Sequence, residues 1–175
     1  MRWLFAYLST IASAVAQAPT LPPTGSFVYI DQVGSYNTTY VVQDTTEKQA
    51  AIINKGDSND LTVYQTGSGN HTAMIANGPA NTTSTNSNNV LGIFQSGSGN
   101  HSASILFQNG ATNSNNNASI TQAGGAGANK QFTLQLNGNG IGATVVQDNA
   151  TTPDSSSMSI TCLAPPCGGY SYIKH

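Results

Sequence analysis

An 11-residue repeat is the feature that most constrains this chain. Seven-residue segments with alternating apolar character begin at positions 26, 37, 48, 59 and 70, so the period holds over five copies. Further copies begin at 89, 100, 116, 129, 141 and 156, after spacers of varying length. Each copy is too short to bury its apolar residues alone, so the repeat predicts an architecture of stacked, similar units.

The composition of each segment indicates a β-strand. β-branched and aromatic residues are frequent, and Gly or Asn interrupts the chain every few residues, which disfavours a helix. The first, third, fifth and seventh residues of a strand share one face. That face is the more regular one in the segments that begin at Ser26, Asn59 and Asn89, so we expect it to face inward.

The spacers have the chemistry of tight turns. VGSY, KGDS, TGSG and SGSG all carry Gly at their second position, where a positive φ costs little. Two strands and two turns then make one flattened coil, so the predicted fold is an all-β, parallel β-solenoid of about five to six 22-residue coils with two facing sheets. The predicted turn glycines are Gly34, Gly56, Gly67, Gly97 and Gly124.

Stacked coils give inward amides a way to avoid the cost of burial. Gln32 would lie over Asn54 and Gln43 over Gln65, so that each amide bonds to those above and below it, as in cross-β ladders. The predicted ladder residues are Ser26, Gln32, Asn37, Gln43, Asn54, Asn59, Gln65, Asn70, Gln95, Asn100, Gln122, Asn129, Gln135 and Gln147.

These residues resemble the curlin repeat, Ser-x5-Gln-x-Gly-x-x-Asn-x-Ala-x3-Gln, of the curli fibre subunits of Gram-negative bacteria. Residues 26–43 match it except for Thr39 in place of Ala, and residues 65–70 and 95–100 match its Gln-x-Gly-x-Gly-Asn core. The final Gln is replaced by Ala76 and Leu106, so the chain resembles a divergent member. The resemblance implies a fibre subunit, either major or nucleating, that is served by an outer-membrane secretion channel and a periplasmic chaperone.

The charge content is compatible with stacking. Only 12 of 175 residues are charged, five basic and seven acidic, and the net charge is −2. No basic cluster suggests nucleic acid as a partner. No cap is evident at either end of the predicted solenoid, so its strand edges would recruit further copies of the chain.

The N-terminus has the layout of a secretory signal. Met1-Arg2 precedes an apolar run that is too short to span a bilayer, and cleavage is expected after residue 16, or alternatively after 18. The expected organisation is a signal at 1–16, a short segment at 17–25, the solenoid at 26–147, and a final half-coil with a tail at 148–175. We therefore expect a secreted, extracellular chain that passes through the periplasm and that does not insert into a membrane once mature.

Other features leave alternatives open. A monomeric secreted solenoid that binds ice or a surface is the second functional hypothesis, and single, scattered acids argue against an enzyme. No cofactor or metal is expected: His71 and His101 are interpreted as exposed turn residues, with a metal or pH-sensing pair as the alternative. Two cysteines in an exported chain predict a Cys162–Cys167 disulfide. The GGYSYIKH tail is then either a cap or a docking strand, and the insertions at 77–88 and 107–115 should bulge from the coil ends.

Overall fold

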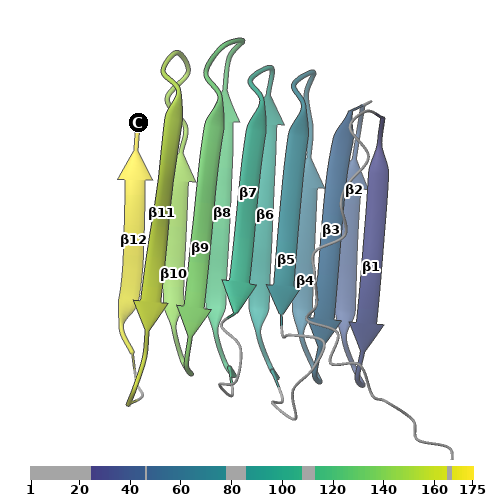
Figure 1. Ribbon diagram of the computed structural model, residues 1–175, viewed down its shortest axis with the longest axis vertical. Helices are drawn as coiled ribbons and strands as arrows, with labels where there is room; N and C mark the ends of the chain where they lie inside the picture. The colour runs from purple at the N-terminus through teal and green to yellow at the C-terminus, as the bar shows by residue number, and fades with distance from the viewer. Residues whose placement is uncertain (1–24, 46, 78–85, 108–112, 165–166) are drawn as a thin grey trace, which may run out of the picture.

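The computed structural model describes residues 25–45, 47–77, 86–107, 113–164 and 167–175, and the fold is given for these residues. Their regular structure consists of β-strands, which alternate between two facing six-stranded sheets (Figure 1). Every strand lies parallel to its neighbours within its own sheet. The predicted parallel β-solenoid is therefore confirmed.

The odd-numbered strands form the first sheet, called sheet A. Its strand order follows the sequence because each successive coil adds one strand to the same edge. The strands are β1 (Phe27–Val33), β3 (Lys48–Lys55), β5 (His71–Asn77), β7 (His101–Phe107), β9 (Lys130–Asn137) and β11 (Asp154–Thr161).

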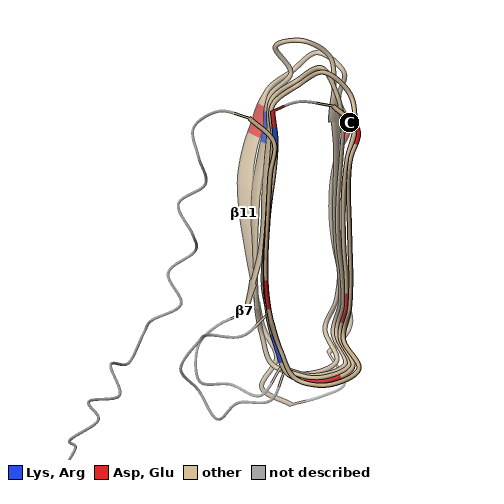
Figure 2. Cartoon of the chain, turned by 90° about the vertical axis from the view of Figure 1, so that its right-hand side faces the viewer, with Lys and Arg blue, Asp and Glu red and all other residues tan. Residues whose placement is uncertain are grey.

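The even-numbered strands form the second sheet, called sheet B. They run in the direction opposite to the strands of sheet A (Figure 1). The two sheets form the long walls of a flattened tube (Figure 2). The strands are β2 (Thr38–Gln43), β4 (Asp60–Gln65), β6 (Val90–Gly97), β8 (Asn117–Gly124), β10 (Gly142–Gln147) and β12 (Gly169–Lys174).

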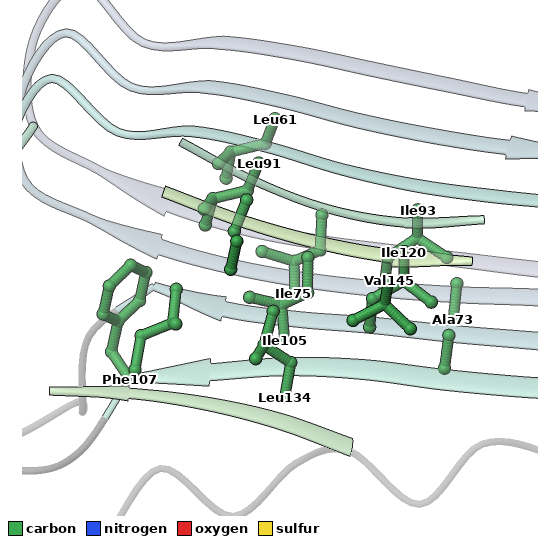
Figure 3. Packing of buried hydrophobic residues seen from close by; sticks show 14 of the residues in the cluster. Leu61, Ala73, Ile75, Leu91, Ile93, Ile105, Phe107, Ile120, Leu134 and Val145 are labelled. Carbon is green, nitrogen blue, oxygen red and sulfur yellow. The ribbon is translucent and has the colours of Figure 1, made fainter. Parts of the chain in front are cut away.

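Aliphatic side chains fill the space between the sheets in columns that follow the strand register (Figure 3). In sheet B, Val63, Ile93 and Ile120 occupy equivalent positions on successive strands, and all are fully buried. In sheet A, Ile52 and Ile75 do the same. Burial of such side chains contributes on the order of 2 kcal/mol each, which is what brings the two sheets together.

The register differs from the expected one on three strands of sheet A. Lys48 pairs with His71 and His71 with His101, so the inward set on β5 and β7 begins one residue later than the 11-residue phase predicts. Asn70, Asn100 and Asn129 consequently lie on the exposed outer corner. A shift of one residue exchanges the two faces of a strand, and the regular spacing in the sequence concealed it.

The C-terminal region is a complete coil, not a half-coil with a tail. Strand β11 pairs with β9, and the tail itself forms β12, which pairs with β10 from Gly142↔Gly169 to Gln147↔Lys174. The tail therefore closes the last coil of its own chain. The expected signal and short segment lie, except for residue 25, outside the described residues, as do most of the two insertions.

Candidate functional site: amide ladders and two unlike ends

A continuous glutamine ladder runs along the inside of sheet B. The side-chain Nε2 of Gln43 donates to Oε1 of Gln65 at 2.9 Å, and Gln65 donates in the same way to Gln95 at 2.9 Å. Gln95 donates to Gln122 and Gln122 to Gln147, both at 2.8 Å. The donors all point toward the C-terminal coil, so the ladder has an oxygen end at Gln43 and an N–H end at Gln147.

Each glutamine also bonds across the tube to sheet A. Nε2 of Gln65 donates to the backbone carbonyl of Gln49 at 3.0 Å, and Nε2 of Gln95 donates to that of Thr72 at 3.0 Å. An amide nitrogen carries two N–H groups, and the ladder uses only one of them. The second proton thus ties the two sheets together near one narrow end of the coil.

Asparagine ladders occupy the opposite corner. The side-chain Oδ1 of Asn37 accepts from both the backbone N–H and the Nδ2 of Asn59, at 3.0 and 3.1 Å. Asn89 donates in the same two ways to Asn59, and the backbone N–H of Asn116 donates to Oδ1 of Asn89 at 3.0 Å. Asn89 and Asn116 occupy the first position of their repeats, so extending the predicted ladder along that position would have identified them.

A second amide column crosses the same corner but stops halfway along the stack. Gln32 pairs with Asn54 in register, and Nδ2 of Asn77 donates to Oδ1 of Asn54 at 2.8 Å. Phe107 and its register partner Leu136 then occupy the inward positions of the next two coils. The predicted ladder residue Gln135 precedes Leu136 and faces outward, because β9 carries the one-residue shift in register.

The exposed asparagines still stack, although not inside the tube. Oδ1 of Asn100 accepts from the backbone N–H of Asn70 at 3.1 Å, and Oδ1 of Asn129 accepts from that of Asn100 at 2.9 Å. Ser26 directly precedes β1 in the column of Lys48, but on this terminal coil it is exposed and donates to the Thr45 carbonyl at 3.3 Å. These residues therefore bond side chain to backbone, not amide to amide.

Ionisable side chains occupy the inward column that the register shift creates in sheet A. Lys48, His71, His101, Lys130 and Asp154 follow one another on successive strands, and each is at most 7% exposed. The interpretation of the two histidines as exposed turn residues is wrong. Their rings stack with centroids 4.9 Å apart. The one-residue shift is what places them inside.

The two lysines of this column bind backbone carbonyls, whereas the histidines have few partners. Nζ of Lys48 donates to the carbonyls of Gly67 and Gly69 at 2.7 and 2.5 Å, and Nζ of Lys130 donates to that of Thr152 at 2.5 Å. Among the described residues, neither ring nitrogen of His71 has a hydrogen-bond partner of ordinary geometry.

Burial sets the protonation state of the histidines. It lowers the pKa of His71 to about 4, and the positive charge of Lys48 and the neighbouring ring of His101 act in the same direction. A backbone interaction with Gly99 raises that pKa only in part. Burial also lowers the pKa of His101. Both rings are therefore neutral at pH 7.

The glycine turns permit the coils to stack closely. Gly34, Gly56, Gly67 and Gly97 have φ between +89° and +128°, whereas Gly124 does not adopt a positive φ. A Cβ on Gly67 would lie 2.4 Å from the carbonyl oxygen of Gly97 on the next coil. These turns therefore need glycine both for the backbone conformation and for the close approach of the next turn.

In the part of the chain that the structure describes, no coil covers the inward face of the N-terminal coil. Val28 and Ile30 are 45% and 47% exposed, whereas Ala50 and Ile52, their partners on the next coil, are fully buried. The outer edges of β1 and β2 are the first in their sheets, so their backbone groups face away from the stack. This end resembles an interior coil from which the neighbour has been removed.

The C-terminal coil carries a charged cluster around Asp154. Its carboxylate accepts from Nε2 of Gln147 at 2.6 Å, from the Tyr172 hydroxyl at 3.2 Å and from Nζ of Lys174 at 3.0 Å. Burial alone would raise the pKa of Asp154, but Lys174 and the other donors together hold that pKa below its usual value. The Tyr172 ring also packs against Phe132. The two ends of the stack are therefore chemically unlike.

The last coil also carries the disulfide. Cys162 is bonded to Cys167, and the bridge lies between β11 and β12. Cys162 is 7% exposed and belongs to the buried apolar cluster of the tube. The bridge closes a short loop next to the strand that completes the stack.

The described residues offer no recognisable metal centre. They contain no group of three or more His, Cys, Asp or Glu side chains able to hold a metal ion. They also contain no helix long and apolar enough to cross a membrane.

Comparisons with protein-family models, curated proteins and solved structures found no match for this chain.

Proposed function

We propose that this chain is a secreted structural subunit that stacks end to end into extracellular, curli-like amyloid fibres of a biofilm matrix. The observation that carries the proposal is the open N-terminal coil. Its inward Val28 and Ile30 and its free strand edges continue the register of the coils beneath them. Free strand edges recruit further strands, and a contact that does not close on itself produces a filament.

The ladders favour another coil as the partner. An incoming parallel coil would extend the glutamine ladder at Gln43 as well as both sheets, whereas an unrelated surface would leave these amides unpaired. The proposed partners are therefore further copies of the chain, together with the major subunit or nucleator, the secretion channel and the chaperone that the curlin resemblance implies. Adhesion to surfaces would be a property of the fibre.

Assembly of the purified chain tests the proposal. The full-length chain and a chain beginning at Gln17 are incubated at micromolar concentration with thioflavin T, followed by electron microscopy and fibre diffraction. The expected result is fibres with spacings near 4.7 and 10 Å. A chain that stays monomeric for days under these conditions would refute the proposal.

A matched pair of variants links assembly to the open coil. Ile30→Lys places a charge on the inward face of β1, whereas Tyr29→Lys places the same charge on the outward face of the same strand. We expect Ile30→Lys to slow fibre growth at least about tenfold, since a buried unpaired charge is costly. Tyr29→Lys should assemble at nearly the rate of the unmodified chain. Equal effects of the two variants would show that β1 is not the docking edge.

A second candidate function is a monomeric binding protein. The observation that favours it is a groove of about 560 Å³ on the outer side of sheet A, lined in part by the polar side chains of Thr72, Ser102, Gln131 and Ser155. These side chains come from four successive strands of the sheet. If the chain remains monomeric, substitution of Ser102 by Arg and glycan or surface binding assays become the relevant tests.

A further inference from the structure

The glutamine ladder has a direction along the stack. Each glutamine donates toward the C-terminal coil and accepts on its N-terminal side. Gln43 is the first member, so its Oε1 faces the open N-terminal end. A coil placed on that end completes the ladder only if it offers an N–H donor at the matching position.

The C-terminal coil places such a donor at the end of the same column. Gln147 pairs with Lys174 in register, so Lys174 occupies the next ladder position on β12. Its ammonium group has three N–H donors, its one described hydrogen bond goes to Asp154, and its side chain is 50% exposed. One end of the stack thus presents an oxygen acceptor and the other an N–H donor at equivalent positions.

The direction of the strands distinguishes two ways of joining copies. Head-to-tail stacking keeps β1 parallel to β11 and β2 parallel to β12, as in all the pairings within the chain. Joining two N-terminal ends requires a two-fold axis, which makes the paired strands antiparallel and brings two copies of the open acceptor end into one interface. Only the head-to-tail joint continues the interface that the chain already uses between its own coils.

The remaining inward positions are also compatible with the head-to-tail joint. Continuing the registers brings Ser26 of the added copy beside Asp154, a hydroxyl donor beside a carboxylate acceptor. It likewise brings the open Ile30 beside Met158 and Val41 beside the ring of Tyr172. Asp44, the residue after Gln43, is exposed and lies outside this inward set.

We propose that a second copy docks its N-terminal coil on the C-terminal coil, where the ammonium of Lys174 donates to Oε1 of Gln43 in the added copy. This inference rests on the proposed fibre function and assigns a polarity to the fibre. Lys174 follows Gln147 in the column and supplies the donor at the subunit boundary, and Asp154 remains the counter-ion that permits the ammonium to be buried there.

Cross-linking tests the polarity directly. Ile173 and Val42 are the outward neighbours of the two joint residues, and the head-to-tail register makes them adjacent between copies. The double variant Val42→Cys, Ile173→Cys is assembled and treated with a short thiol–thiol cross-linker. We expect a series of multimers on a denaturing gel from the double variant and only monomers from either single variant.

Two results overturn the joint while leaving the fibre proposal intact. Dimers from Val42→Cys alone would show that N-terminal ends meet each other. Fibres of the double variant that yield no cross-linked multimers would show that these two coils do not meet. A chain that forms no fibres refutes the proposed function instead, before any cross-linker is added.

Charge substitutions test the donor itself. Lys174→Glu should slow elongation by about tenfold or more, because it replaces the donor by a carboxylate next to Asp154 and Gln43. Ile173→Glu, which puts the same charge on the outward face of the same strand, should have little effect. Lys174→Gln restores an amide donor and should elongate within about threefold of the unmodified chain. A Lys174→Gln chain that elongates as slowly as Lys174→Glu would contradict the ladder mechanism.

Discussion

Mild acid should destabilise the folded chain through His71 and His101. Both rings lie in the inward column between Lys48 and Lys130, and they stack on each other. A proton on either ring would add a positive charge to a buried column that already holds two ammonium groups. Asp154, the acid of that column, lies beyond Lys130 and is already paired with Lys174.

The sign and the size of the effect follow from the pKa of His71. The fold lowers it from 6.5 to about 4, so the unfolded chain takes up the proton first as the pH falls. The contribution of neutral His71 to the free energy of unfolding is therefore fully present above pH 6.5 and is lost as the pH falls from 6.5 to about 4. At about 1.4 kcal/mol per pH unit, His71 alone accounts for a loss of about 3 kcal/mol. The lowered pKa of His101 adds to this loss.

Urea denaturation of freshly prepared monomer, followed by circular dichroism, measures the effect at pH 7.5, 6, 5 and 4. The free energy of unfolding of the unmodified chain should fall by at least about 3 kcal/mol over this range. The double variant His71→Gln, His101→Gln has no titrating ring in the column and should lose less than about 1 kcal/mol above pH 4.5. An equal loss in both chains would refute the reasoning, as would an unmodified chain whose stability does not change between pH 7.5 and 4.

Further substitutions test the ladder, the turns and the Asp154 cluster by the same denaturation assay. Gln95→Ala removes two ladder bonds and one bond to the facing sheet, so it should cost about 2 to 4 kcal/mol, whereas the outward Gln131→Ala should change stability by less than about 0.5 kcal/mol. Gly56→Ala puts a Cβ 1.9 Å from a carbonyl oxygen of the next coil and should disrupt the stack, while Gly127→Ala, which meets no atom within 4 Å, should cost only about 1 kcal/mol for its positive φ. Asp154→Ala leaves a buried amide and an ammonium without their acceptor and should cost about 2 to 3 kcal/mol. A neutral Gln95→Ala or Asp154→Ala would contradict the hydrogen-bond account, and equal losses at the two glycines would contradict the steric one.

The fold and the interior of sheet B follow directly from the sequence. Its strands from β2 to β10 each keep the expected phase and end their inward set on a glutamine. The inward register of these strands is visible in the sequence because Asn, aliphatic and Gln positions recur together. They recur because the side chains of an inward face must match those of the coils above and below. A sequence pattern is informative where the same physical constraint acts on every copy.

In sheet A, the sequence pattern does not predict which residues of β5, β7 and β9 face inward. The spacing from 48 to 59 to 70 suggests an uninterrupted period, but the structure pairs Lys48 with His71. Turns with glycine accommodate one extra residue at little cost, so spacing alone does not fix which residue points inward. Burial of Ala73 and Ile75 in place of Thr72 and Met74 decides the register. The stacked histidines follow from that choice and have no signal of their own in the repeat.

The shift in register also changes how the low number of charged residues is interpreted. Of the 12 charged residues, Lys48, Lys130 and Asp154 are buried in one column, so even fewer charges remain to separate one copy from another. The glutamine ladder is the same from β2 to β10 and does not distinguish one coil from the next. The ionisable column does: if β5 were paired with β9 in place of β7, His71 would lie beside Lys130, not beside His101. Amides therefore make the coils able to stack, and the few buried charges restrict which coil stacks on which.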